Sequence, residues 1–303
     1  MWTRTLAFLA AIVLGVVPPV PAQLKVVTTI PDLADIVSVI GGERIKKVTS
    51  LAKGTMNVHA VPLRPSKLIA ASKADLFLQV GLSLEHAYVP GLLLQARNAR
   101  IKPGSPGFVT CAEGWEPIQV PDMISRGLSA DLHPDGNPHF NLDPKGGKHI
   151  ADRILGGLIA VDPSGEKEYR ERHAAFLAKI AEHEKRWVEI RKKLKGKRVV
   201  MYHGDFNYLL ESCGMQSIGT LEPKPGLPPT PKHMAQLVRL MNKESVKVIL
   251  TAKWSNNSNC RFVAKKTGAR IVELPVMVGG VKGADSWLEM MDVLHESLLR
   301  AFE

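Results

Sequence analysis

Cysteine is scarce in this sequence, which has three such residues among 303: Cys111, Cys213 and Cys260. No two of them form a Cys-x-x-Cys pair, so a thiolate metal site is not expected. Because the number is odd, at least one thiol is unpaired or pairs between chains. If a disulfide forms, we expect it to join Cys213 and Cys260, since both belong to the second half of the chain.

Long apolar runs are absent after the first residues, so no membrane-spanning helix is expected in the rest of the chain. The opening segment combines Arg4 with a short apolar stretch over residues 6–17 and with small residues at Val20-Pro21-Ala22. This pattern is typical of a cleaved export signal, and its apolar stretch is shorter than the roughly 20 residues of a bilayer span. We predict a signal peptide over residues 1–22, removed near Ala22, and a periplasmic mature protein. A short membrane anchor is the alternative.

Acidic residues are outnumbered, because 29 Asp and Glu stand against 40 Lys and Arg, a formal net charge of +11. A basic surface can bind nucleic acid. The basic residues are scattered, however, and their one run, RKKLKGKR at 191–198, has no interleaved aromatic residues. We therefore expect no nucleic-acid partner. Hydrophobic residues make up 45% of the chain, which is enough for a sizeable core.

Strand-like and helix-like segments alternate along the chain. In the first half, strands are predicted at 24–30, 46–52, 75–81 and 107–113, and helices at 31–42, 64–74, 85–97 and about 145–161. In the second half, strands are predicted at 197–203, 215–222, 246–252 and 269–275, and helices at 206–214, 230–245, 260–268 and 285–302. This order favours α/β architecture with mostly parallel sheets covered by helices.

A long helix is predicted between the two halves. Residues 165–197 form an amphipathic pattern of about thirty residues, roughly 45 Å long as a helix. Its apolar positions recur at intervals of three, four and seven: Tyr169, Phe176, Ile180, Trp187, Ile190 and Leu194. We predict an N-terminal α/β lobe at 23–163, a connector helix at 164–196 and a C-terminal α/β lobe at 197–303.

Three of the ten histidines lie in loop or strand-end positions suited to a shared site. His59 follows the second strand, His203 ends the first strand of the second lobe, and His139 lies in the stiff segment GNPHFNLDP. In open α/β sheets, ligands bind beyond the carboxyl ends of the strands, and neutral imidazole is the commonest metal ligand. The histidines are far apart in sequence, so a shared metal site and separate hydrogen-bonding loop histidines both remain open at this point.

The segment around His139 is built to be rigid. Pro138 restricts the backbone immediately before the histidine. Asp143-Pro144 is typical of a helix start, with Asp143 as the cap. A stiff loop places the imidazole before metal arrives, which lowers the ordering entropy lost on binding.

Several stretches in order resemble the metal-binding solute-binding proteins of ABC importers, the zinc and manganese group. They are TTIPDLADIVSVIGGERIKKVTSL, NVHAVPLRPSKLIAASKADLFLQVGLSLE, GNPHFNLDP, VVMYHGDFNYLLESCGM and GADSWLEMMDVL. The resemblance covers residues 24–302. It implies two α/β lobes joined by one long helix, with a metal site in the cleft between them and an inner-membrane ABC-type metal permease as partner. It also implies a protein that is not an enzyme; we expect a monomer.

The resemblance implies four metal ligands: His59, His139, His203 and Asp285. A histidine at the third position goes with zinc in this family, so Zn2+ is expected, with Mn2+ as the alternative. The chain departs from the family pattern where Asn57-Val58 precede His59. It also lacks the long His-rich loop of zinc-specific relatives, offering only DMISRGLSADLHPDG, with Asp131, His133 and Asp135. We assign no chemical role to the proline-rich segment EPKPGLPP at 222–229.

Two other functions fit three converging histidines. A periplasmic zinc enzyme would keep an open position at which zinc-bound water becomes acidic enough to attack a substrate. A structural or adhesive surface protein would use metal only to stabilise its fold. A carboxylate that closes the coordination shell would argue against the enzyme.

Overall fold

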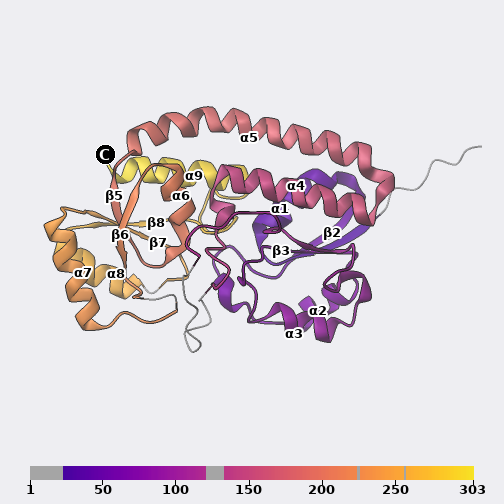
Figure 1. Cartoon of the computed structure of the whole chain (residues 1–303), viewed down its shortest axis with the longest axis horizontal. Coiled ribbons are helices and arrows are strands. Elements are labelled where there is room, and N and C mark those ends of the chain that lie inside the picture. The colour runs from indigo at the N-terminus through magenta and orange to yellow at the C-terminus, as the bar shows by residue number, and fades with distance from the viewer. Residues whose placement is uncertain (1–22, 121–132, 224–225, 256) are drawn as a thin grey trace, which may run out of the picture.

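Two parallel sheets of four strands form the centre of the protein (Figure 1). This computed structural model describes residues 23–120, 133–223, 226–255 and 257–303. The expected signal peptide at 1–22 lies outside the described residues. No helix in these described ranges has the length and apolar character needed to cross a membrane.

The first sheet has the strand order β2-β1-β3-β4, with every pair parallel. Its core residues include Val26 and Val27 on β1 and Phe77 on β3, all almost completely buried. The strands are β1 (Leu24–Thr28), β2 (Ile45–Ser50), β3 (Leu76–Gln79) and β4 (Phe108–Thr110), and the helices are α1 (Pro31–Gly41), α2 (Pro65–Ser72), α3 (Val89–Ala96) and α4 (Pro144–Val161).

The second sheet repeats this arrangement in the order β6-β5-β7-β8, again with every pair parallel. Its strands are β5 (Arg198–Met201), β6 (Gln216–Thr220), β7 (Val248–Thr251) and β8 (Arg270–Glu273), and its helices are α6 (Asn207–Ser212), α7 (Pro231–Lys243), α8 (Asn257–Thr267) and α9 (Trp287–Ala301). The predicted two-lobe α/β fold is therefore confirmed, whereas the exact domain boundaries stay a prediction.

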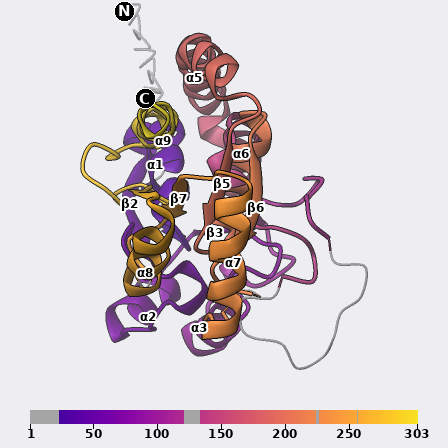
Figure 2. The ribbon, with the colours of Figure 1, turned by 90° about the vertical axis from the view of Figure 1, so that its left-hand side faces the viewer.

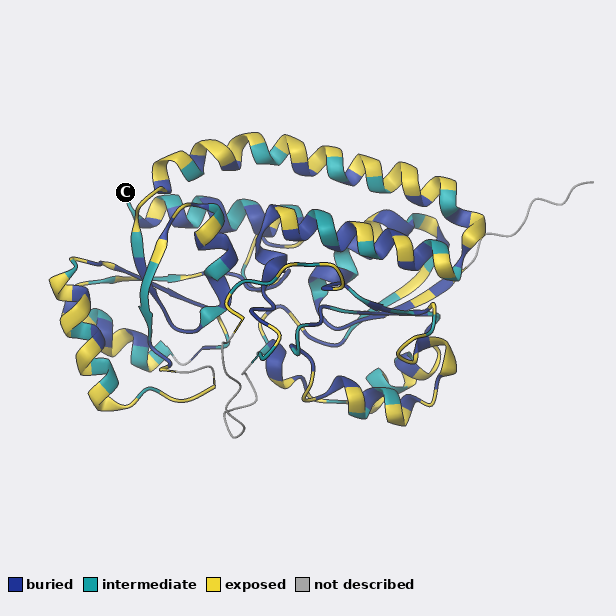
Figure 3. Cartoon of the chain, in the orientation of Figure 1, coloured by how far each residue is buried: buried dark blue, intermediate teal, exposed yellow. Residues whose placement is uncertain are grey.

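The connector is helix α5, Glu166–Leu194, which runs along both lobes (Figure 1). Its 29 residues span about 44 Å at about 1.5 Å each. It contacts α1, α4 and α9 and lies opposite α2, α3, α7 and α8 (Figures 1 and 2). Its outward face is exposed (Figure 3), and the buried stripe consists of the six predicted apolar residues: Tyr169, Phe176, Ile180, Trp187, Ile190 and Leu194.

Buried hydrogen bonds centred on Asn141 join the two lobes. Asn141 Nδ2 donates to Asp32 Oδ1 on α1 at 2.9 Å and to the carbonyl of Val276, after β8, at 3.1 Å. The other oxygen of Asp32 accepts from the Val278 amide at 3.0 Å. Trp287 Nε1, at the start of α9, donates to the Asn141 carbonyl at 2.9 Å. The lobes are thus fixed to each other near the loop that carries His139.

The cysteine prediction is corrected by the structure, because all three cysteines are buried free thiols. Cys213 belongs to the main hydrophobic core, whereas Cys260 belongs to the smaller core of the second lobe. Val199 and Val200, consecutive residues of β5, belong to different cores, and consecutive strand residues point to opposite faces, so the two cores lie on opposite faces of the second sheet. The sheet therefore separates the two thiols that were expected to pair.

The buried carboxyl of Asp32 predicts a specific pH dependence of stability. Burial raises the pKa of Asp32 from 3.8 to about 7, against the hydrogen bonds from Asn141 and Val278, and the nearby Asp35 charge adds to the increase. The folded state therefore binds more protons than the unfolded state between these two values, and this contribution to stability falls as pH rises through that window. Asp32→Asn cannot titrate. Relative to this variant, the wild type should lose stability from pH 5 to 8, by less than about 1.4 kcal/mol per pH unit.

Urea unfolding of the metal-free protein at pH 5, 6, 7 and 8 measures this difference. A constant offset is expected because asparagine removes one acceptor, so the readout is the change with pH. Glu43→Gln removes an exposed carboxylate of the same lobe and is the control. An offset between wild type and Asp32→Asn that stays constant over this range would contradict the prediction.

Candidate metal centre

The same local hydrogen-bonding pattern positions His59 and His139, the two predicted ligand histidines of the first lobe. His59 lies in the 3-10 turn Val58–Ala60, and Asn57 Oδ1 accepts a hydrogen bond of 2.9 Å from its backbone amide. Asn137 Oδ1 likewise accepts from the His139 amide at 2.9 Å. An asparagine two residues earlier thus fixes the backbone of each histidine. Asn57, which departs from the family pattern, supports the loop in this way.

The helix after His139 begins as the sequence predicts. Asp143 is the N-cap of α4, and its Oδ1 accepts from the amides of Lys145 and Gly146 at 2.6 and 3.4 Å. Pro144 is the first helical residue. The stiff segment therefore runs from a side-chain turn at Asn137 to a capped helix, with His139 between the two.

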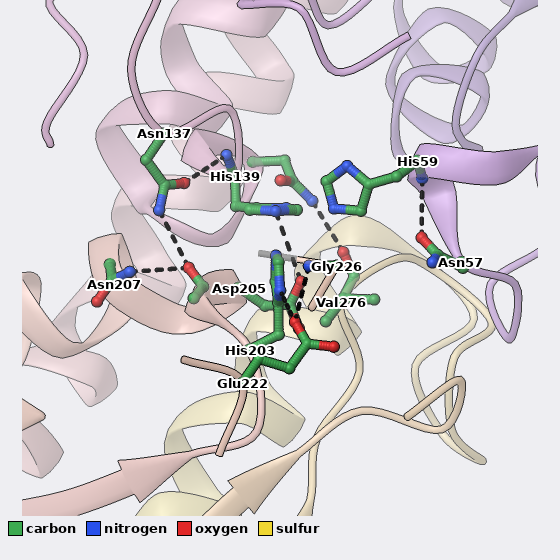
Figure 4. Close-up of polar contacts among 12 residues, drawn as sticks. Asn57, His59, Asn137, His139, His203, Asp205, Asn207, Glu222, Gly226 and Val276 are labelled. Atoms are coloured by element: carbon green, nitrogen blue, oxygen red, sulfur yellow. Dashed lines mark hydrogen bonds and ion pairs between the residues drawn. The ribbon is translucent and has the colours of Figure 1, made fainter. Parts of the chain in front are cut away.

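Three predicted ligands and one further residue converge (Figure 4). His59, His139, His203 and Asp205 each offer one ligand atom, and these atoms lie within 4.8 Å of one another. All four residues are buried. The ring centroid of His59 lies 5.3 Å from that of His139 and 5.4 Å from that of His203. Both lobes contribute, since His203 and Asp205 follow β5.

Two imidazoles of this group, those of His59 and His139, are held neutral. Burial lowers the pKa of His59 and of His139 well below the ordinary value, and neighbouring histidines, among them His203 and His133, lower both further. Among the described residues, neither ring nitrogen of His59 and not the Nε2 of His139 has a hydrogen-bond partner. Such buried nitrogens cost about 1–3 kcal/mol each when left unsatisfied. Buried nitrogens that are unprotonated and lack a hydrogen-bond partner are suited to bind a divalent metal.

The structure does not bring Asp285 into this group. Asp285 is exposed in the loop before α9, where its amide donates to Glu289 Oε2 at 3.2 Å. The carboxylate in the group is Asp205, whose Oδ1 lies 3.5 Å from His139 Nε2. Asp205 lies two residues after His203 in the 3-10 turn Gly204–Phe206. An acid so close to a strand-end histidine, in the sequence HGD, was the signal that could have identified it.

A fourth imidazole, that of His133, borders the group. Its ring centroid lies 4.9 Å from that of His59 and 6.4 Å from that of His139. Burial and the nearby His203 lower the pKa of His133 to about 4. Asp135 accepts from Ser83 Oγ at 2.6 Å, and Asp131 lies outside the described residues. The role of His133 could not be assigned from sequence because its loop has no periodic pattern.

The histidines expected to be structural have ordinary partners. His173 pairs with Asp152, and His183 pairs with Asp292. The remaining ones contact backbone carbonyls: His86 at Ser83, His149 at Glu113, His233 at Thr220 and His295 at Met291.

Comparison with known proteins agrees with this geometry. The family model for ZnuA, described as zinc-uptake complex component A, periplasmic, matches residues 26–301. The chain belongs to this family. It is 24% identical over 300 residues to the high-affinity zinc uptake system protein ZnuA of Yersinia pestis, covering 95% of this chain and 94% of that protein.

Two further comparisons extend over most of the chain. The manganese ABC transporter substrate-binding lipoprotein PsaA of Streptococcus pneumoniae is 24% identical over 278 residues, which is 89% of this chain and 86% of that protein. A crystal structure of ZnuA has a TM-score of 0.78 at 20% identity, covering 93% of this chain and 100% of that chain, so the fold is shared.

Membership of the ZnuA family confirms the resemblance read from the sequence motifs. The protein is a metal-binding substrate-binding component of an ABC importer, and it works outside the cytoplasm with a membrane permease. The zinc-enzyme alternative is excluded, because the family and the relatives are transport proteins.

Proposed function

We propose that this protein captures zinc in the periplasm, after removal of its signal peptide near Ala22, and delivers the ion as a monomer to an inner-membrane ABC permease. The observation that supports this most directly is the buried group of three imidazoles and one carboxylate contributed by both lobes, in which burial holds His59 and His139 neutral. Zinc is the cargo in this proposal, not a resident cofactor.

The proposed ligands are His59 and His139 from the first lobe and His203 and Asp205 from the second. Asp205 replaces the expected Asp285, because it lies within the group whereas Asp285 is exposed. Four donors, three of them nitrogen, suit tetrahedral zinc with bond lengths of about 2.0–2.2 Å. Manganese prefers carboxylates and water, which makes Mn2+ the weaker alternative.

The ligand set is tested by zinc titration of the mature protein. We expect one tight site per chain, and His139→Ala or His203→Ala should weaken it by about 100-fold or more, because loss of a ligand exceeds the 10–100-fold effect of an outer-shell change. Asp205→Asn should also weaken binding, whereas Asp285→Asn is the matched control and should not.

The two aspartate variants separate two ligand sets. Weaker binding in Asp285→Asn with unchanged binding in Asp205→Asn would restore Asp285 as the fourth ligand. Unchanged affinity in both histidine variants would mean that zinc binds elsewhere.

The choice of metal is tested by competition. At pH 7 with equimolar Zn2+ and Mn2+, we expect the protein to retain zinc, because imidazole nitrogens suit zinc better and the affinity of a given site for divalent zinc exceeds that for manganese. Metal content after desalting, measured by mass spectrometry, gives the ratio. Retained manganese would overturn the assignment of zinc.

A further inference from the structure

The segment EPKPGLPP at 222–229 received no function from its sequence, yet it begins with a residue that contacts the metal centre. Glu222 follows β6 and is 7% exposed. Its Oε2 lies 2.8 Å from Nδ1 of His203 and also accepts from the Gly226 amide at 3.2 Å. Glu222 lies below the His203 ring in Figure 4, whereas His59 and His139 lie above it.

Backbone pairing fixes this contact. Beyond the ends of β5 and β6, the Leu221 amide donates to the Met201 carbonyl at 2.8 Å and the Glu222 amide donates to the Tyr202 carbonyl at 3.0 Å. Glu222 and His203 therefore emerge side by side from neighbouring parallel strands. Both side chains are more than nine-tenths buried, so the surrounding residues restrict their movement.

The contact decides which nitrogen of His203 can hold a metal. A neutral imidazole has one nitrogen that carries a proton and donates, and one nitrogen with a lone pair that accepts or binds metal. The hydrogen-bond partner of one nitrogen therefore determines which of the two carries the proton. A carboxylate can only accept, so Nδ1 is the nitrogen that donates in this contact, and in the neutral ring the lone pair is then on Nε2. Carboxylate partners of this kind orient metal-binding histidines and raise their basicity. His59 has no such partner among the described residues.

We propose that Glu222 is a positioning residue, which fixes the tautomer and ring orientation of His203 for metal capture. This proposal rests on the proposed function. The competing explanation is purely structural, in which Glu222 only accepts the hydrogen bond from the Gly226 amide. The two explanations differ in what they require of the His203 ring in the metal-free protein, so that state is the first readout.

Long-range ¹H–¹⁵N NMR of the histidine rings in the metal-free protein at pH 7.5 reports the tautomer, and loss of the signals in His203→Gln assigns them. In the wild type we expect His203 to carry its proton on Nδ1. In Glu222→Ala this preference should be lost, and zinc affinity should fall by about 10–100-fold. Glu222→Gln keeps the shape and an acceptor oxygen but not the charge, so its tautomer and affinity should lie between these two.

The matched control is Glu273→Gln. Glu273 also ends a strand of the second sheet, β8, but it is exposed and faces Lys253 at 3.9 Å. This variant should change neither readout. Thermal unfolding of each variant identifies a general loss of structure, and Glu222→Gln keeps the test valid if Glu222→Ala does not fold.

Three outcomes would overturn the proposal: a proton on Nε2 of His203 in the wild type, an unchanged tautomer in the Glu222 variants, or a changed tautomer with unchanged zinc affinity. Failure of the proposed function is recognised separately. Zinc binding that persists in both His59→Ala and His203→Ala would disprove the site itself, while the NMR measurement needs no metal.

Discussion

The geometry of the proposed metal centre depends on the buried hydrogen bonds of Asn141, because this residue connects the loop of His139 to both lobes. Its side chain bonds Asp32 on α1 and the Val276 carbonyl after β8, and its own carbonyl accepts from Trp287. Each of these groups is buried, so loss of the asparagine side chain would leave unsatisfied atoms at about 1–3 kcal/mol each. The relative position of the lobes, and hence of their ligands, follows from this connection.

The two lobes fix their histidines by different means. In the first lobe, asparagine side chains hold the backbone of His59 and His139 and leave the unpartnered ring nitrogens noted above for a ligand. In the second lobe, Glu222 contacts the His203 ring itself. The folded chain thus bears the desolvation of the imidazoles before metal arrives, and metal binding offsets that cost.

The helices and strands could be predicted from the sequence, but the contacts between them could not. Apolar periodicity identified α5 down to its six buried residues, and Asp143-Pro144 identified the start of α4. Strand-end position for His59 and His203, together with the family resemblance for all three, predicted that His59, His139 and His203 lie together. Glu222 was missed because it meets His203 only through the register of β5 and β6, 19 residues apart in sequence. The prediction of a disulfide between Cys213 and Cys260 was wrong for a similar reason. The face of the sheet on which each thiol lies depends on how α6 and α8 pack on that sheet.

The positions of the proposed ligands in both lobes have a consequence for release of the ion. His59 and His139 belong to one lobe and His203 and Asp205 to the other, so no lobe alone provides a full set. The connector α5 is a continuous helix packed on α1, α4 and α9, and it has no proline or glycine at which it could kink. A small displacement of the loops that carry the ligands is therefore a less costly route than bending α5. Such a displacement would lower the number of donors from four to two and release the metal, while the two sheets remain intact.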